Sequence, residues 1–494
     1  MSAPDHHGGR TPLPHELEEV VIDTRPIALI LLSQSVRPFM LSAGAAAFAI
    51  LATATPPHGL SVVAERALAV FAIAVSYWVT GALPLMVTSL LVIVLLGVSG
   101  VMPPKNAYAL FGNETIFFLL SAFMLAAAVN HRGLGKRIAL GIFGRFGRTP
   151  AALVRAIYLL SAAMSLLIPE HAVAAMVFPI VLDLAASMKL EPGRSRYATA
   201  LFLAMAWGVN IGGIGTLLGG ARGPLALGIL AEATGQSISF LRWSLATVPL
   251  VAILLVAGYF VLSRYFRSEL VSVENSVAEL GRRYAGLGRM KFEEKAVAAI
   301  LALTVMAWLF GSTRYGLAGI AILAVVALFV FNLLSWHEVE EYVNWGIILM
   351  YGGAIALGSA LDHTGAAAYL ASATLGRTQS PALMLAILSL ITLLSAEALS
   401  HSAVVAALLP VGLGLARRFG IEPRSITLTV AVPAGLTFVL PVGTPSIALA
   451  YSSGYLRTRE LLGAGALMWL CAWAGLNLII QFYWPLIGLG PLSG

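Results

Sequence analysis

Long apolar runs dominate this chain and decide what it can fold into. A helix needs about 20 apolar residues to cross a hydrocarbon core of roughly 30 Å, and runs of this kind recur from Pro38 to Ile480. Hydrophobic residues fill 59% of the 494 positions and charged residues only 11%, which is not the composition of a soluble chain. The runs do not alternate with polar residues, so a membrane β-barrel is excluded. The sequence predicts an all-α polytopic membrane protein with about 11 transmembrane helices plus two re-entrant hairpins.

Charge divides the chain into four regions. Residues 1–36 begin with acidic and polar side chains and are predicted to form a cytoplasmic tail rather than a signal peptide. Residues 263–295 carry many charges without a membrane-length apolar run, which indicates a cytoplasmic linker with an amphipathic helix. Between and after them lie two apolar halves, residues 37–262 and 296–494.

The two halves carry matching landmarks, which predicts an internal duplication. His131 and His363 close similar apolar runs at an offset of 363 − 131 = 232. Pro179 and Pro410 follow similar Ala-Val runs at an offset of 231, and a Gly-Thr pair recurs at Thr216 and Thr444 with an offset of 228. Paired repeats that build a site near the bilayer midplane are typical of secondary transporters.

Basic residues flank the segment 151–188 on both sides, which predicts a re-entrant hairpin. Short basic loops face the cytoplasm, and such residues both precede and follow this segment: Arg132, Lys136, Arg137, Arg145 and Arg148, then Lys189, Arg194 and Arg196. The segment must therefore enter and return, with its turn shielded from lipid. The repeat predicts a second hairpin at 380–418, entering from the other side.

Polar residues at membrane depth usually line a pathway or pair with one another, and here they concentrate at the predicted hairpin tips. The first tip carries Glu170 and His171, and the second carries Ser400, His401 and Ser402, preceded by Glu397. Proline and serine suit helix starts, so each tip is predicted to begin a helix aimed at a shared centre. We expect the five tip residues to bind substrate, with Glu170, His171, Glu397 and His401 as candidates for ion coupling.

Two runs rich in Gly and Pro are predicted to break membrane helices into halves. The first run contains Asn210, Gly215, Thr216 and Arg222, and the second contains Gly443, Thr444 and Pro445. Half-helix N-termini present free N–H groups to an anion, and freed carbonyl groups can hold a cation. These residues complete the predicted substrate site. Whether Arg222 faces its centre or a mouth stays open.

Several motifs resemble the divalent anion/sodium symporter family from about Ala67 to the C-terminus. They are Tyr77 to Pro84 (YWVTGALP), Trp345 to Gly353 (WGIILMYGG), the hairpin runs ending in Pro179 and Pro410, GGIGTLLG at 212–219, and PVGTP at 441–445 followed by Tyr451 to Gly454. The resemblance implies inverted repeats, a scaffold that forms a homodimer, a transport domain that slides as an elevator, and di- or tricarboxylate or sulfate as substrate.

The hairpin tips depart from the family, whose tips read Ser-Asn-Thr and hold sodium and substrate. Both tip asparagines are absent here, and Gly223 and Ile447 stand where the family's broken-helix loops usually reach an asparagine. An ionised Glu170 about 4 Å from a substrate carboxylate would cost roughly 4 kcal/mol at an effective dielectric near 20. A titratable Glu with two His residues suits proton coupling, so the tips predict a proton-linked or pH-gated anion transporter with Arg222 as the main anion contact.

Other functions stay open at this stage. A sodium-coupled dicarboxylate or sulfate symporter and a passive anion uniporter are the alternatives, and an intramembrane metalloenzyme is disfavoured because no His-Glu-x-x-His motif is present. We expect no enzyme activity and no cofactor or metal, because the single cysteine, Cys471, permits neither a disulfide within the chain nor a cysteine cluster. The net charge of +7 does not imply nucleic acid. The expected partners are an anion, H⁺ or Na⁺, and the lipid of the cell membrane, which is the inner membrane in a bacterium.

Overall fold

The computed structural model describes residues 27–266, 269, 272–375, 380–440 and 443–490, and the regular elements within them are helices. Ten helical segments of this part are long and apolar enough to cross a membrane: Val36–Thr53, Val62–Thr80, Pro104–His131, Glu170–Ser187, Phe240–Tyr265, Phe292–Tyr315, Trp345–His363, Pro381–Ala398, His401–Phe419 and Thr458–Ile487. The chain is a multi-pass membrane protein.

About 11 spans were predicted outside the hairpins, and the ten segments include three hairpin helices. The difference has a local cause. The helices at four predicted spans, α3 (Leu85–Val98), α9 (Arg196–Gly213), α14 (Leu317–Val330) and α20 (Pro423–Ala431), are not among the ten. α3 and α14 have 14 residues each, α20 has nine, and α9 ends at Gly213, inside the first predicted break.

The first half contains ten α-helices in the described residues. They are α2 Val62–Thr80, α3 Leu85–Val98, α4 Pro104–Ala109 with the 3₁₀ turn η1 Leu110–Gly112, α5 Glu114–His131, α6 Leu134–Phe146, α7 Pro150–Ser165, α8 Glu170–Ser187, α9 Arg196–Gly213, α10 Arg222–Thr234 and α11 Phe240–Tyr265.

The second half repeats this order with ten α-helices in its described part. They are α13 Phe292–Tyr315, α14 Leu317–Val330, α15 Trp336–Tyr342, α16 Trp345–His363, α17 Ala366–Leu375, α18 Pro381–Ala398, α19 His401–Phe419, α20 Pro423–Ala431 with η2 Pro433–Gly435, α21 Pro445–Ser452, and α22 Thr458–Leu478 continued by η3 Ile479–Tyr483 and η4 Trp484–Ile487.

The start of α7 precedes that of α18 by 381 − 150 = 231 residues, and the start of α8 precedes that of α19 by 401 − 170 = 231. The hairpin helices therefore keep the offset found between Pro179 and Pro410.

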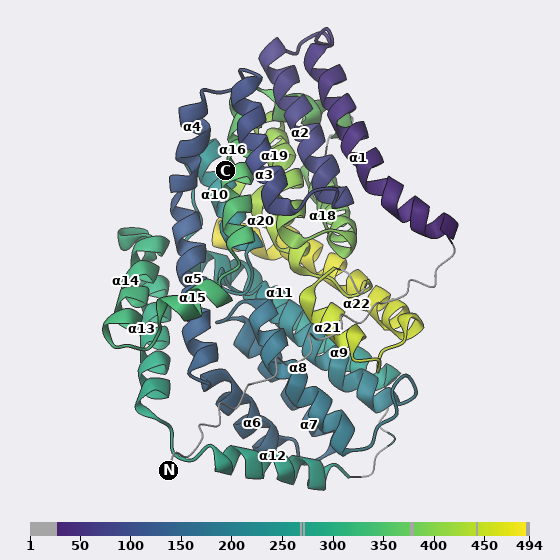
Figure 1. Cartoon of the computed structure of the whole chain (residues 1–494), viewed down its shortest axis with the longest axis vertical. Coiled ribbons are helices and arrows are strands. Elements are labelled where there is room, and N and C mark those ends of the chain that lie inside the picture. The colour runs from purple at the N-terminus through teal and green to yellow at the C-terminus, as the bar shows by residue number, and fades with distance from the viewer. Residues whose placement is uncertain (1–26, 267–268, 270–271, 376–379, 441–442, 491–494) are drawn as a thin grey trace, which may run out of the picture.

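The second part of each broken helix packs against the opposite half of the chain. α10 packs against α16, α19 and α20 of the second half, whereas α21 packs against α8 and α9 of the first half. Figure 1 shows α6, α7 and α8 toward the lower end of the long axis and α2, α18 and α19 toward the upper end. The two hairpins thus approach the middle of the molecule from opposite ends.

Two helices lie outside the repeat. α1 (Ile27–Thr53) packs against α2 and begins inside the range predicted as a tail, of which residues 1–26 lie outside the described residues. α12 (Glu274–Gly286) lies within the predicted linker, buries Val277 and Leu280, and packs against α6 and α8. Figure 1 shows α12 across the lower end of the molecule, beneath α6 and α7.

Candidate functional site

The two hairpin tips meet at a charged cluster of three residues. Glu170 is the first residue of α8, His401 is the first of α19, and Arg222 is the first of α10. Arg222 Nη1 lies 3.0 Å from Glu170 Oε2, and His401 Nδ1 lies 3.1 Å from Glu170 Oε1. Arg222 Nη1 also lies 3.3 Å from His401 Nδ1. The structure therefore brings together three predicted site residues from both hairpins and the first broken helix. We call them the tip cluster.

Local sequence explains why three helices begin at this point. Pro169 occupies the N-cap of α8 with φ −53° and ψ 137°, a conformation that turns the chain into the helix. Ser400 caps α19, and its Oγ accepts a hydrogen bond from the Ala403 N–H at 3.3 Å. A glutamate in a first turn interacts favourably with the helix dipole. Three helix N-termini at one place give it a positive potential.

The tip cluster is almost closed to solvent. The exposed fractions are 3% for Arg222, 8% for Glu170 and 8% for His401, so Arg222 faces the centre and not a mouth. The Arg222 guanidinium lies directly against Gly435, where any larger side chain would overlap it. Arg222 Nη2 and His401 Nε2 are buried and have no hydrogen-bond partner among the described residues. Buried polar groups are normally satisfied, so these two nitrogens are available to a ligand.

Asn210, near the end of α9, joins the first broken helix to the second. Its Nδ2 donates to the Thr437 carbonyl at 2.9 Å and lies 3.3 Å from Thr444 Oγ1, while Ser446 Oγ donates to Asn210 Oδ1. Thr444 caps α21, whose first residue is Pro445. Asn210 and Thr444 therefore hold the two breaks together and have partners within the protein.

Glu397 performs a similar task inside the second half. Its carboxylate accepts hydrogen bonds from the backbone N–H groups of Phe438, Val439 and Leu440, at 2.8 to 3.2 Å. These groups belong to the chain between η2 and α21. Glu397 thus acts as an internal anion that fixes the second break, and it does not belong to the tip cluster.

The first break is fixed differently. Thr216 Oγ1 donates to the Leu166 carbonyl at 2.6 Å, and the Gly215 carbonyl accepts from Thr247 Oγ1 at 3.0 Å. A methyl group placed on Gly213 would lie 3.1 Å from Glu170 Oε2, 3.2 Å from Ser165 Oγ and 3.3 Å from the Gly219 carbonyl oxygen. Three oxygens from the first hairpin and the break therefore surround one point, which we call the Gly213 point.

Ser165 and Thr437 escaped the sequence prediction. Ser165 Oγ is buried without a hydrogen-bond partner in the described part of the chain. Its position was readable from the repeat, because 397 − 165 = 232 pairs it with Glu397 at the offset of the histidines. Thr437 stands outside the Gly- and Pro-rich motif, so no signal in the sequence distinguishes it.

The remaining predicted residues surround the cluster. His171 packs its ring edge-on against Phe123 of α5, with centroids 5.7 Å apart. Ser402 is buried in the first turn of α19, whereas Ser400 is exposed at the cap. The Gly443 N–H donates to the Leu440 carbonyl at 3.4 Å, within the second break.

Two hairpins and two broken helices around one buried charged centre define a secondary transporter. Residues 36–489 match the family model described as the sodium:sulfate symporter transmembrane region, and the chain belongs to this family. It is a secondary anion transporter and not an enzyme.

Relatives of known name support the same assignment. The chain is 26% identical over 438 residues to the sodium-dependent dicarboxylate transporter SdcS of Staphylococcus saprophyticus, covering 83% of this chain and 84% of that protein. Identity to SdcS of Staphylococcus aureus (strain bovine RF122 / ET3-1) is 27% over 440 residues, with the same coverage. MtrF of Neisseria gonorrhoeae, described with a class of antimetabolite efflux pumps, has a TM-score of 0.55 at 12% identity over 82% of this chain and 96% of its own. This last similarity concerns the fold alone.

Proposed function

We propose that this protein is a secondary active symporter that moves a small dicarboxylate together with sodium. The relatives named above are sodium-dependent dicarboxylate transporters that span most of this chain. They favour sodium over the proton-linked mechanism that the hairpin tips alone predict. The observation that carries the proposal is the convergence of Glu170, Arg222 and His401 at three buried helix starts.

The anion binds at the tip cluster. Arg222 Nη1 donates a hydrogen bond to Glu170, but Arg222 Nη2 and His401 Nε2 are buried without partners in the described residues. A carboxylate can accept hydrogen bonds from both nitrogens, and charge-assisted bonds of this kind are short and strong. Since Glu170 and Arg222 neutralise each other, a bound dianion needs a further cation nearby.

Sodium supplies that cation between the three oxygens that surround the Gly213 point, beside the point itself, which is only one C–C bond from the Gly213 Cα. The point has Glu170 Oε2, the Ser165 hydroxyl and the Gly219 carbonyl within 3.1 to 3.3 Å of a methyl position on Gly213. Hard cations prefer carboxylate, hydroxyl and carbonyl oxygens. Glu170 would then contact the cation on one side and Arg222 on the other, which couples cation binding to anion binding.

A proton-linked cycle is the second candidate, because Glu170 and His401 share a contact of 3.1 Å between the two hairpins. Glu-His pairs inside membranes occur in proton relays. In Glu170→Gln a proton-linked carrier would lose the pH dependence of its uptake, whereas a sodium-coupled carrier would need a higher sodium concentration for half-maximal uptake.

The test is uptake of labelled succinate by protein reconstituted in liposomes. We expect accumulation above the outside concentration when an inward sodium gradient is imposed, and no accumulation with potassium in its place. Accumulation driven by a pH gradient without sodium would establish the proton-linked cycle instead. If the succinate concentration inside the liposomes never exceeds that outside under any gradient, the protein is a passive uniporter and symport is overturned.

We also propose that the protein works as a homodimer with an elevator movement of the hairpins against a scaffold, as the family resemblance implies. Native mass spectrometry of the detergent-solubilised full chain measures the oligomeric state, and a monomer that transports at the full rate would contradict the dimer.

A further inference from the structure

A cavity whose lining includes none of the tip-cluster residues lies where α6, α8 and α12 meet. It has a volume of about 540 Å³ and lies between the end of α5, α6, the outer part of α8 and α12. Small-molecule sites have volumes of this order. Its lining residues are Asn130, Gly133, Lys136, Leu140, Met176, Pro179, Ile180, Asp183, Arg283, Gly286 and Leu287.

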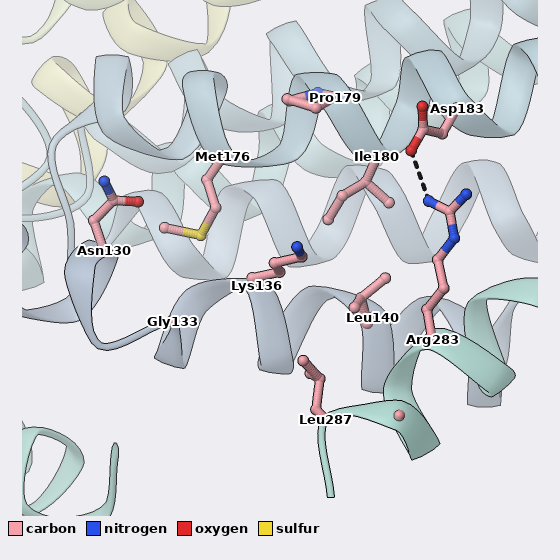
Figure 2. Close-up of a pocket in the computed structure, with 11 residues that line it drawn as sticks. Asn130, Gly133, Lys136, Leu140, Met176, Pro179, Ile180, Asp183, Arg283 and Leu287 are labelled. Atoms are coloured by element: carbon pink, nitrogen blue, oxygen red, sulfur yellow. Dashed lines mark hydrogen bonds and ion pairs between the residues drawn. The ribbon is translucent and has the colours of Figure 1, made fainter. Parts of the chain in front are cut away.

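The cavity combines cationic groups with an apolar wall. Lys136 extends from α6 between α6 and α8, and Arg283 reaches up from α12 (Figure 2). Leu140, Met176 and Ile180 form apolar lining on the same helices. Within the described residues, no carboxylate lies in ion-pair distance of Lys136. Such a site suits a ligand with one anionic end and one apolar end.

The ion pairs of Arg283 are exposed to solvent. Its Nη1 contacts Asp183 Oδ2 at 2.6 Å, and the side chains of Arg283 and Asp183 are 47% and 54% exposed. Its Nε lies 3.5 Å from Glu279 Oε1, and Glu279 also pairs with Arg282. Exposed ion pairs contribute little to stability. A phosphate that approaches from Lys136 can therefore bind Arg283 as well. Three cations, Lys136, Arg282 and Arg283, face the two carboxylates of Asp183 and Glu279, which leaves one positive charge in excess.

The position of the cavity selects the source of the anion. Eight basic residues lie in or beside α6 (132–148) and between α8 and α9 (189–196), next to the cavity-forming helices. Because short basic loops face the cytoplasm, we assign this end to the cytoplasmic side. The cytoplasmic leaflet carries anionic lipids, and basic pockets between helices on that side bind their headgroups. α12 buries Val277 and Leu280 and exposes Arg282 and Arg283, the pattern of a helix at a membrane surface.

We propose that this cavity binds the phosphate headgroup of an anionic phospholipid of the cytoplasmic leaflet, held by Lys136 and Arg283, with the glycerol and upper acyl chain against Leu140, Met176 and Ile180. The bound lipid joins α8, a helix of the first hairpin, to α6 and α12. The inference rests on the cavity and its orientation and does not require the proposed substrate.

Native mass spectrometry of the full-length protein tests the site. The protein is mixed with phosphatidylglycerol or phosphatidylcholine, and retained lipid is counted for wild type, Lys136→Gln, Arg283→Gln and Arg194→Gln. Arg194 is a matched control because it is exposed on the same end, pairs with Glu191 and lies outside the cavity lining. Soluble glycerol phosphate serves as the headgroup without chains.

We expect wild type and Arg194→Gln to retain more phosphatidylglycerol than phosphatidylcholine. In Lys136→Gln and Arg283→Gln the ratio of retained phosphatidylglycerol to phosphatidylcholine should fall at least fivefold. Equal retention by all four proteins would overturn the site. Retention of glycerol phosphate as strong as that of the lipid would overturn the lipid as occupant. Because both Gln variants keep most of the side chain and lie at an exposed rim, a circular dichroism melt that matches wild type shows that each is folded.

Discussion

At the scale of single residues, the pair Glu170 and Arg222 governs the proposed site. Glu170 forms an ion pair with the Arg222 guanidinium, the group that would otherwise bind an anionic substrate. The glutamate therefore competes with the substrate and also keeps Arg222 neutralised while the site is empty. Removing one partner from a buried pair leaves the other charge uncompensated.

Glu170→Gln is expected to lower stability by about 3 to 5 kcal/mol without ligand, the usual cost of breaking a buried pair. In sodium-free buffer, succinate should then restore more stability than it adds to wild type, because it supplies the missing charge. Thermal unfolding with and without succinate measures both effects. Glu293→Gln is the control, since Glu293 is exposed at the start of α13. Equal succinate shifts in Glu170→Gln and wild type would contradict the competition.

Gly213→Ala is expected to raise the sodium concentration for half-maximal uptake by roughly tenfold, which corresponds to about 1.4 kcal/mol. The added methyl group would occupy the Gly213 point, in contact with Glu170, Ser165 and Gly219. Gly463→Ala in α22 is the matched control, because a methyl group there has no neighbour within 4 Å. An unchanged sodium dependence in Gly213→Ala would exclude the three oxygens around this point as the cation site.

Much of the site was predictable at this scale, because ionised groups at membrane depth are rare and conspicuous. Glu170, Arg222 and His401 were predicted as site residues on that ground, and the structure brings them into contact. Ser165 was marked only by its repeat offset from Glu397, and Thr437 by nothing in the sequence, since the role of a hydroxyl depends on what packs against it.

At the scale of elements, the second break depends on Glu397. Four hydrogen bonds from three consecutive N–H groups converge on its carboxylate. Glu397→Gln puts an N–H₂ group opposite these donors. We expect a loss of about 2 kcal/mol, the typical worth of a hydrogen bond to a charged group. Thermal unfolding in detergent compares this variant with Glu293→Gln, and identical midpoints would show that the break is held by other contacts.

Helix α15 is tied to the end of α5 through Glu338. Burial alone would raise the pKa of Glu338, but hydrogen bonds from Ser335 and the charges of Arg132 and His131 together lower it below its ordinary value. A lowered pKa in the folded state means that the stabilisation is present above the unfolded pKa, near 4.3, and is lost as pH falls through the folded pKa.

The acid sensitivity of wild type should therefore exceed that of Glu338→Gln. At pH 7 we expect the variant to be less stable by about 1 kcal/mol, with the difference shrinking below pH 4. Unfolding midpoints between pH 3.5 and 7 measure it. A constant difference across this range would mean that the carboxylate charge is irrelevant and that only the hydrogen bonds from Ser335 matter.

The sequence predicted the long elements better than the short ones. The basic flanks indicated the first hairpin, the repeat indicated the second, and the runs rich in Gly and Pro indicated both breaks. Helices α4 and α15 were not predicted, because six or seven residues contain too few turns for an apolar period. Their caps, such as Ser335 before Glu338, were the available signal.

At the scale of the whole molecule, the repeat is more than a copied order of helices. α10 crosses to the second half and α21 to the first, so each hairpin packs with a segment from the other half. Three landmarks in the sequence predicted the duplication. The packing of α10 and α21 on the opposite halves was not predictable, because contacts between distant segments do not affect the periodicity of apolar residues. This packing explains why Arg222, encoded in the first half, reaches His401 in the second.

Movement of the first hairpin against α12 is the last expectation. Asp183 lies on α8 and Arg283 on α12, and their side chains touch. In a Cys471→Ser background, cysteines at both positions joined by a flexible bifunctional thiol reagent should stop uptake if α8 must slide past α12, as an elevator requires. The same variant treated with a monofunctional reagent should keep wild-type uptake. Full uptake after complete cross-linking, verified by mass spectrometry, would mean that α8 and α12 move together or not at all.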